Sequence, residues 1–395
     1  MMKKEEKEQN KGSVGQIIVM LFFIAVGACA GVLMAEYLDT RNPDGSSLKE
    51  IIPEFLLLMV VLYLALFLQT IIHEGGHLVF GLLTGYRFSS FWIGSLMLVM
   101  ENGKLRRKKL SVAGTGGQCL MEPPPMKDGM FPYVLYNAGG VICNLISAVL
   151  FVCLSFPLRQ YAFVWAFCMV MGIVGAGSAL INGIPLHAGG IDNDGYNILS
   201  LGKFPEGRRA FWLQMRMNGE IAAGKRLKDM PEEWFEIPSE DAMKNSMAAA
   251  MGVFACNRLM DEMKFSEADR LMEKLLGMDT GIIGLHRSMM KTDQIYCELI
   301  GENRQERLEK LMDKNQRKFM KSMKSFPSVL RTEYAYALLH EKDKSKAEKL
   351  RQQFEKMAKK YPYPNEINGE REFMECCRHL AEKEKTEGKS LPFGE

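Results

Sequence analysis

The sequence carries little net charge and shows no ordered cysteine pattern. The formal net charge is +3 over 395 residues, and no basic stripe interleaved with aromatic residues is present, which argues against a nucleic-acid partner. The cysteines number nine, without a repeating spacing, and Cys143, Cys153 and Cys168 lie in apolar runs. They therefore fit small buried side chains better than a disulfide framework.

Charge is also missing from long stretches of the N-terminal half. Four apolar runs are long enough to cross a hydrocarbon core of ~30 Å, and we expect spans at about 17–36, 55–83, 133–158 and 161–186. A cleaved signal peptide is the alternative for the first run. The small-residue triplet 28–30 lies inside that run rather than after it, which favours an uncleaved span.

The loops between the expected spans alternate between basic and acidic composition. Lysine and arginine gather in the tail 1–16, in the loop 87–127 and after residue 200, whereas the loop 36–54 is acidic on balance. This asymmetry predicts a multi-pass protein of the cell membrane with both termini in the cytoplasm.

Histidine is scarce, with six residues, yet two of them fall in the pentapeptide His73-Glu74-Gly-Gly-His77 within the second apolar run. On a helix, His73 and His77 face the same way, so both imidazoles can bind one zinc ion (Zn²⁺). Glu74 can take a proton from a metal-bound water. The alternative is a buried helix that tolerates polar residues. It is disfavoured because ionisable groups at lipid depth are costly and are normally functional.

A zinc site needs a third protein ligand. The segment 182–195 follows the last expected span, and Pro185 and a glycine pair break the helix there, as a loop returning to the metal requires. Asp192, Asp194 and His187 are all chemically able to serve as the ligand.

A β-structured insertion is expected at 87–125. The runs 91–100 and 105–112 flank Asn102-Gly103, a strong hairpin signal, and 114–125 can continue as an edge strand that ends at prolines. The glycines at 114–117 do not form a phosphate-binding loop, because no Gly-Lys-Ser/Thr follows them. The edge strand either holds an unwound substrate by main-chain hydrogen bonds or merely caps the membrane helices.

Three elements together resemble the site-2 protease family of intramembrane zinc metalloproteases, over roughly residues 50–200. They are the His-Glu-x-x-His motif, the Gly140-x-x-x-Asn144 element in the third span, and the Asn-x-x-Pro and Asp-Gly pairs that begin at Asn182 and Asp194. The resemblance implies a zinc ion bound by the two histidines and Asp194, with Glu74 as general base. It also implies substrate contacts for Asn182 and Asn144.

One departure from the family pattern bears on the third ligand. The interval between Pro185 and Asp194 is longer than usual, so Asp192 remains an alternative ligand. Gly195 favours Asp194, because it completes the family's Asp-Gly pair and permits a tight backbone turn.

The region 201–395 is expected to be a soluble all-α cytoplasmic domain. Segments at 240–260, 267–276, 304–320 and 346–359 combine helix-forming residues with helical apolar spacing. Two helical joins faintly resemble a tetratricopeptide hairpin. Its methionines, among them Met272, Met289, Met290, Met320 and Met323, either line an adaptable binding groove or pack the core.

The expected molecule is thus an α-helical multispanning membrane protein, with an intramembrane metalloprotease domain at 17–200 and a helical domain at 201–395. Its expected substrate is a transmembrane or membrane-proximal peptide segment in the lipid bilayer, and the helical domain is a candidate site for a protein partner. A membrane scaffold that recruits partners is the alternative function. A zinc transporter is disfavoured, because the spans hold almost no further ionisable residues.

Overall fold

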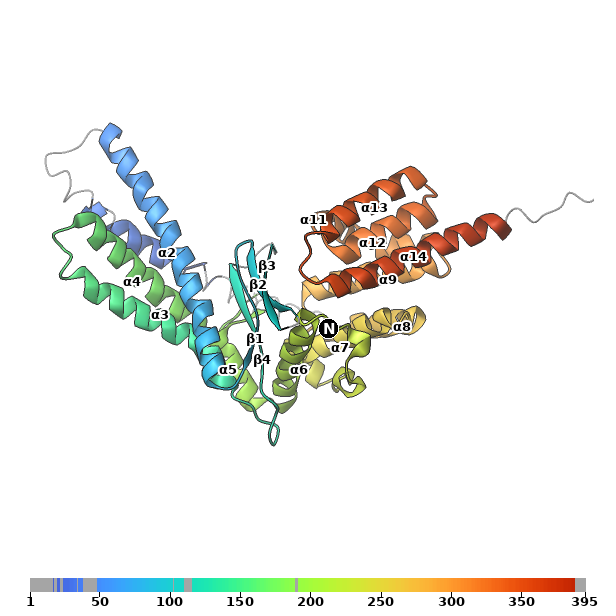
Figure 1. The fold of residues 1–395 in the computed structure, drawn as a ribbon, viewed down its shortest axis with the longest axis horizontal. Helices are drawn as coiled ribbons and strands as arrows, with labels where there is room; N and C mark the ends of the chain where they lie inside the picture. The colour runs from blue at the N-terminus through green and yellow to red at the C-terminus, as the bar shows by residue number, and fades with distance from the viewer. Residues whose placement is uncertain are drawn as a thin grey trace, which may run out of the picture. The chain divides into compact units, whose positions relative to one another are not determined.

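The computed structural model describes residues 17, 20, 21, 24–33, 35–37, 48–101, 103–109, 116–188 and 191–387. The chain divides into two compact units. The first comprises Met1–Leu98 and Ser111–Arg208, and the second comprises Val99–Leu110 and Arg209–Glu395. Most elements are helices, accompanied by a four-stranded sheet and a two-stranded sheet (Figure 1).

Three helices of the described chain are long and apolar enough to cross a membrane: α2 (Leu48–Leu83), α3 (Tyr133–Ser155) and α4 (Ala162–Gly183). They correspond to the second, third and fourth expected spans. The first expected span, 17–36, falls partly outside the described residues. The residues described there include an apolar helix within Ile24–Tyr37, and a count of four spans is not confirmed.

The three long helices pack against one another, with α3 and α4 side by side (Figure 1). Val61 and Ala65 of α2 are buried against Val170 and Val174 of α4. Leucine, isoleucine, valine and phenylalanine side chains on the remaining helix surfaces are exposed, among them Leu56, Val60, Phe67, Ile146 and Val149. Such a surface is stable when lipid rather than water covers it.

The sheet follows α2 and contains β1 (Arg87–Ile93), β2 (Leu96–Glu101), β3 (Lys104–Lys109) and β4 (Gly117–Glu122), in the order β3-β2-β1-β4. The prediction of one strand over 91–100 was wrong, because Gly94 adopts a φ of +58° and turns the chain between β1 and β2. The hairpin at Gly103 and the edge strand that ends before Pro123 are both confirmed.

After α4 the chain forms a minimal hairpin of β5 (His187–Ala188) and β6 (Ile191–Asp192), and then α5 (Asp194–Lys203). The later helices are α6 (Pro205–Ala222), α7 (Ser246–Asp261), α8 (Phe265–Gly277), α9 (Gly284–Ile300), α10 (Gln305–Leu311), α11 (Lys314–Ser322), α12 (Pro327–Ala335), α13 (Lys344–Ala358) and α14 (Pro364–Glu387). Three short 3₁₀ helices lie between α6 and α7: η1 (Leu227–Asp229), η2 (Glu232–Phe235) and η3 (Ala242–Lys244). A π-helix, η4 (Tyr336–His340), follows α12 directly.

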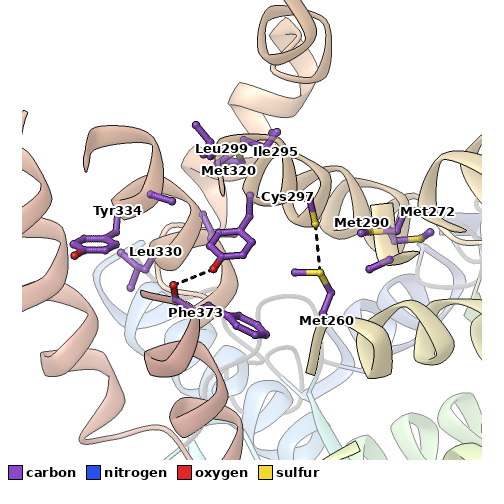
Figure 2. Close-up of a cluster of buried hydrophobic side chains, with 14 of the residues drawn as sticks. Met260, Met272, Met290, Ile295, Cys297, Leu299, Met320, Leu330, Tyr334 and Phe373 are labelled. Atoms are coloured by element: carbon purple, nitrogen blue, oxygen red, sulfur yellow. Dashed lines mark hydrogen bonds between the residues drawn. The ribbon is translucent and has the colours of Figure 1, made fainter. Parts of the chain in front are cut away.

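The second unit packs its helices around a core rich in methionine. Met260, Met272, Met290 and Met320 are buried in this core, and the Tyr296 hydroxyl donates a 2.9 Å hydrogen bond to the Phe373 carbonyl (Figure 2). Met289 and Met323 pack against the same core. All five methionines named from the sequence thus lie in or against this core, whereas the tetratricopeptide resemblance stays a prediction.

Candidate metal centre

Three potential metal ligands converge where α2 meets the start of α5. His73 Nε2 and His77 Nε2 lie 3.2 Å apart, and Asp194 Oδ2 lies 3.1 Å from the first and 3.4 Å from the second. One ligand atom from each residue falls within 4.8 Å of the others, and all three side chains are largely buried.

Hydrogen bonds on the far side of each imidazole fix its tautomer. His77 Nδ1 lies 2.8 Å from the Tyr136 carbonyl, which can only accept, so this nitrogen carries the proton. His73 Nδ1 lies 2.8 Å from Asn144 Oδ1. The Asn144 amide donates from Nδ2 to the backbone and side-chain oxygens of Gln69, so its Oδ1 is left to accept from His73. Both Nε2 atoms therefore present lone pairs.

This arrangement fits a bound cation. The two Nε2 lone pairs face Asp194 Oδ2, which is buried and has no hydrogen-bond donor among the described residues. Three acceptors in contact repel one another unless a positive charge lies between them. Two imidazole nitrogens and one carboxylate oxygen form a ligand set of zinc that leaves a fourth position open for water.

A hydrogen-bonded loop brings Asp194 back to α2. Asn193 organises this loop, because its Oδ1 accepts from the Leu186 and Tyr196 amides while its Nδ2 donates to the Ile181 and Ile184 carbonyls.

Gly195 serves this return in a different way from that expected, because it lies in the first turn of α5 rather than in a special turn. A Cβ on Gly195 would lie 2.1 Å from the Gly183 carbonyl oxygen, so the absent side chain lets the two segments approach.

His187 and Asp192 lie apart from this group and contact each other. Asp192 Oδ1 lies 2.5 Å from His187 Nδ1 across the β5–β6 pair, and this hydrogen bond raises the pKa of His187. Of the three candidates in the loop, only Asp194 joins the two histidines of α2.

Strand β4 holds Glu74. The Cys119 backbone N–H donates a 2.7 Å hydrogen bond to Glu74 Oε2, and the Tyr136 hydroxyl donates to the Cys119 carbonyl at 3.0 Å. Burial and the Glu74 charge raise the pKa of the Cys119 thiol to about 12, and this thiol is not among the three converging ligands.

The two asparagines implied by the resemblance have different surroundings. Asn144 is fully buried and is committed to His73 and Gln69. Asn182 is partly buried on α4, and its Nδ2 donates to the Ser178 carbonyl of the same helix.

Gln69 was missed by the sequence analysis. Its Nε2 donates to Ser147 Oγ and to the Met171 carbonyl, so it ties α2 to α3 and α4 behind the histidines. An amide one helical turn before His73, in an apolar span, was the available signal.

Glycines bring α2 and α3 into direct backbone contact at the centre. A Cβ on Gly76 would lie 2.2 Å from the Gly139 carbonyl oxygen, and a Cβ on Gly140 would lie 2.5 Å from His73 Cε1. Small residues thus allow these two helix backbones to approach closely.

Comparison with known proteins yields one match. Residues 51–176 match the family model described as Peptidase M50B-like. No curated protein and no solved structure matches the chain. The matched segment contains the His-Glu-x-x-His motif and Asn144 but ends before Asp194, so the third ligand rests on the geometry above. Residues 51–176 thus match the Peptidase M50B-like family, which is the site-2 protease family.

Proposed function

We propose that this membrane protein is a zinc-dependent intramembrane protease. The observation that carries the proposal is the convergence of three potential ligand atoms, from His73, His77 and Asp194, beside Glu74 on the apolar helix that carries both histidines. Zinc is the expected cofactor, because the ligand set suits it and the matched family consists of zinc metalloproteases.

Each residue of the centre has a distinct task in peptide hydrolysis. Bound zinc supplies Lewis-acid activation of water and of the scissile carbonyl. Glu74 takes a proton from the attacking water and delivers it to the leaving amine. The Cys119 amide keeps the Glu74 carboxylate oriented, while the Tyr136 carbonyl and Asn144 hold the proton of each imidazole at Nδ1.

The proposed substrate is a transmembrane or membrane-proximal segment in an unwound state, because a helix hides its carbonyls in its own hydrogen bonds. Strand β4 pairs with β1 along one edge only, and its Cys119 amide reaches Glu74. Glu74 and Tyr136 engage the backbone groups of Cys119 on the edge away from β1, so a peptide that adds to this edge would pair with the neighbouring residues of β4 and pass beside the carboxylate. This placement favours substrate binding over simple capping as the role of the strand.

Glu74→Gln tests the catalytic assignment. The variant should retain zinc, because Glu74 is no ligand, and should lose about 10²–10⁴-fold in cleavage rate, because the general base is gone. The measurement uses full-length protein in vesicles with single-span model peptides, followed by mass spectrometry, with the exposed Glu348→Gln on α13 as the matched control.

Near-normal cleavage by purified Glu74→Gln would contradict the assignment. If zinc-loaded wild-type protein cleaves none of the single-span model peptides, the alternative function of a membrane scaffold that recruits partners would be favoured.

A further inference from the structure

The helical unit encloses a cavity of about 550 Å³ that the proposed proteolysis does not use. Its lining residues come from α6, α7, α9, α12 and α14, and from the segments between these helices, all within the second unit. Cavities of this size are typical of ligand sites, which measure roughly 300–1,000 Å³. Met260, Met290 and Phe373 form part of the wall and belong to the core drawn in Figure 2.

Carboxylates outnumber cations on the polar part of the wall. The Arg331 guanidinium is buried over the Tyr296 ring and donates to both Asp293 and Glu370, at 2.6 and 2.8 Å. A single guanidinium thus serves two carboxylates, which leaves that corner with a net negative charge. Burial raises the pKa of both Asp293 and Glu370, which shows that their negative charge is costly in the absence of a further cation.

A second corner repeats this arrangement. Arg226 donates to Asp261 at 2.6 Å and to Glu372 at 2.5 Å, so two carboxylates again share one guanidinium. Lys225, which also lines the cavity, pairs with Glu220 at 2.7 Å. The cations of the wall are therefore already engaged by carboxylates.

Glu366 adds a carboxylate without a cationic partner. It lies one turn before Glu370 on α14, is exposed, and accepts a 2.9 Å hydrogen bond from the Tyr361 hydroxyl. Among the described residues, no lysine or arginine lies within ion-pair distance of it.

The wall also offers amides that have hydrogen-bonding capacity to spare. Asn218 of α6 and Asn257 of α7 are half-buried in the wall, and neither side chain makes a hydrogen bond within the part of the chain described. An asparagine amide both donates and accepts, so it can pair with a peptide N–H and a peptide C=O together. Arg331 Nη1 is likewise buried without a partner, a donor that a ligand carbonyl would satisfy.

We propose that this cavity binds an extended peptide segment that carries a lysine or arginine side chain. Glu366 and Glu370 contact the cation, Asn218 and Asn257 pair with the peptide backbone, and the apolar wall receives the neighbouring side chains. A peptide is the occupant because free amides and an apolar wall together match a backbone with apolar side chains, which a simple amine lacks. The site is separate from the metal centre in sequence and in chemistry.

The test measures binding of fluorescein-labelled peptides Ala-Leu-X-Leu-Ala to full-length protein in detergent by fluorescence anisotropy, with X as lysine, arginine, glutamine or glutamate. Lysine and arginine peptides should bind at least about 10-fold more tightly than the glutamate peptide, because a hydrogen bond between charged groups is replaced by like-charge repulsion. Glu366→Gln should reduce the affinity for the lysine peptide about 10-fold and leave the affinity for the glutamine peptide nearly unchanged.

Two sets of variants separate the contribution of the Glu366 charge from that of the Asn218 and Asn257 amides. Glu375→Gln makes the same chemical change at an exposed site on α14 that already pairs with Arg378, and it should leave all affinities unchanged. The double variant Asn218→Ala, Asn257→Ala should reduce the affinities for the lysine and glutamine peptides by equal factors.

Equal affinity for the lysine and glutamate peptides, or no saturable binding of any cationic peptide below millimolar concentration, would overturn the proposal. Butylamine that competes as well as the lysine peptide would overturn the peptide assignment. None of these outcomes depends on zinc or on cleavage, so failure here is distinguishable from failure of the protease assignment.

Discussion

At the residue scale, the candidate centre depends on hydrogen bonds that hold both imidazole protons at Nδ1. The sequence identified His73, His77 and Glu74, because their spacing on a helix has a direct chemical meaning. It could not identify the Tyr136 carbonyl, since a backbone group leaves no trace in the residue type. Asn144 was found through a resemblance, but its surroundings are those of a residue that orients His73.

Asn144→Ala should reduce zinc affinity by about 10–100-fold, because His73 loses the acceptor that keeps its lone pair at Nε2. Competition with a chromophoric chelator measures this affinity. Asn182→Ala is the matched control, because its amide bonds its own helix and should leave zinc binding unchanged. Equal zinc affinity of Asn144→Ala and the wild type would contradict the orienting role.

At the element scale, helices and spans were predictable where a long apolar pattern determines them, and strand and helix ends were not. Gly94 divided an expected strand through one positive φ. The expected helix 304–320 is two helices, α10 and α11, because the Asp313 side chain accepts from the Gln316 amide and starts a new helix. Single turns and caps of this kind depend on tertiary packing, which apolar periodicity does not record.

The crossing of α2 and α3 makes a prediction about two adjacent glycines. Gly76→Ala should destabilise the protein by about 1–3 kcal/mol, since its Cβ would meet the Gly139 carbonyl oxygen at 2.2 Å. Gly75→Ala should be neutral or slightly stabilising, because no atom lies within 4 Å of its added Cβ. Thermal unfolding in detergent gives the Tm of each variant. Equal Tm values for Gly76→Ala and Gly75→Ala would rule out a close crossing of α2 and α3.

At the scale of the whole molecule, the third ligand could not be settled from sequence. Asp192 and Asp194 are both suitable carboxylates, and the path of the loop brings Asp194 beside the two histidines. That path depends on the four hydrogen bonds of the Asn193 side chain and on the close approach of Gly195 to Gly183. Such contacts join segments whose proximity appears only when the chain is folded.

Membrane orientation yields a separate prediction. The charge asymmetry of the loops places the β2–β3 hairpin in the cytoplasm and residues 39–49 outside. In a cysteine-free background, Asp44→Cys should react with an impermeant thiol reagent on intact cells. Arg106→Cys, on the exposed face of β3, should react only after permeabilisation. Labelling of Arg106→Cys in intact cells would reverse the orientation.

The zinc content of purified full-length protein, measured by mass spectrometry for the wild type, Asp194→Ala and Asp192→Ala, tests the central claim most directly. The proposed centre requires about one zinc per chain in the wild type and in Asp192→Ala, whose carboxylate pairs with His187 instead. Asp194→Ala should lose the metal, because an acceptor that contacts both histidines is removed. A zinc-free wild type, or zinc retained by Asp194→Ala and lost by Asp192→Ala, would contradict the account.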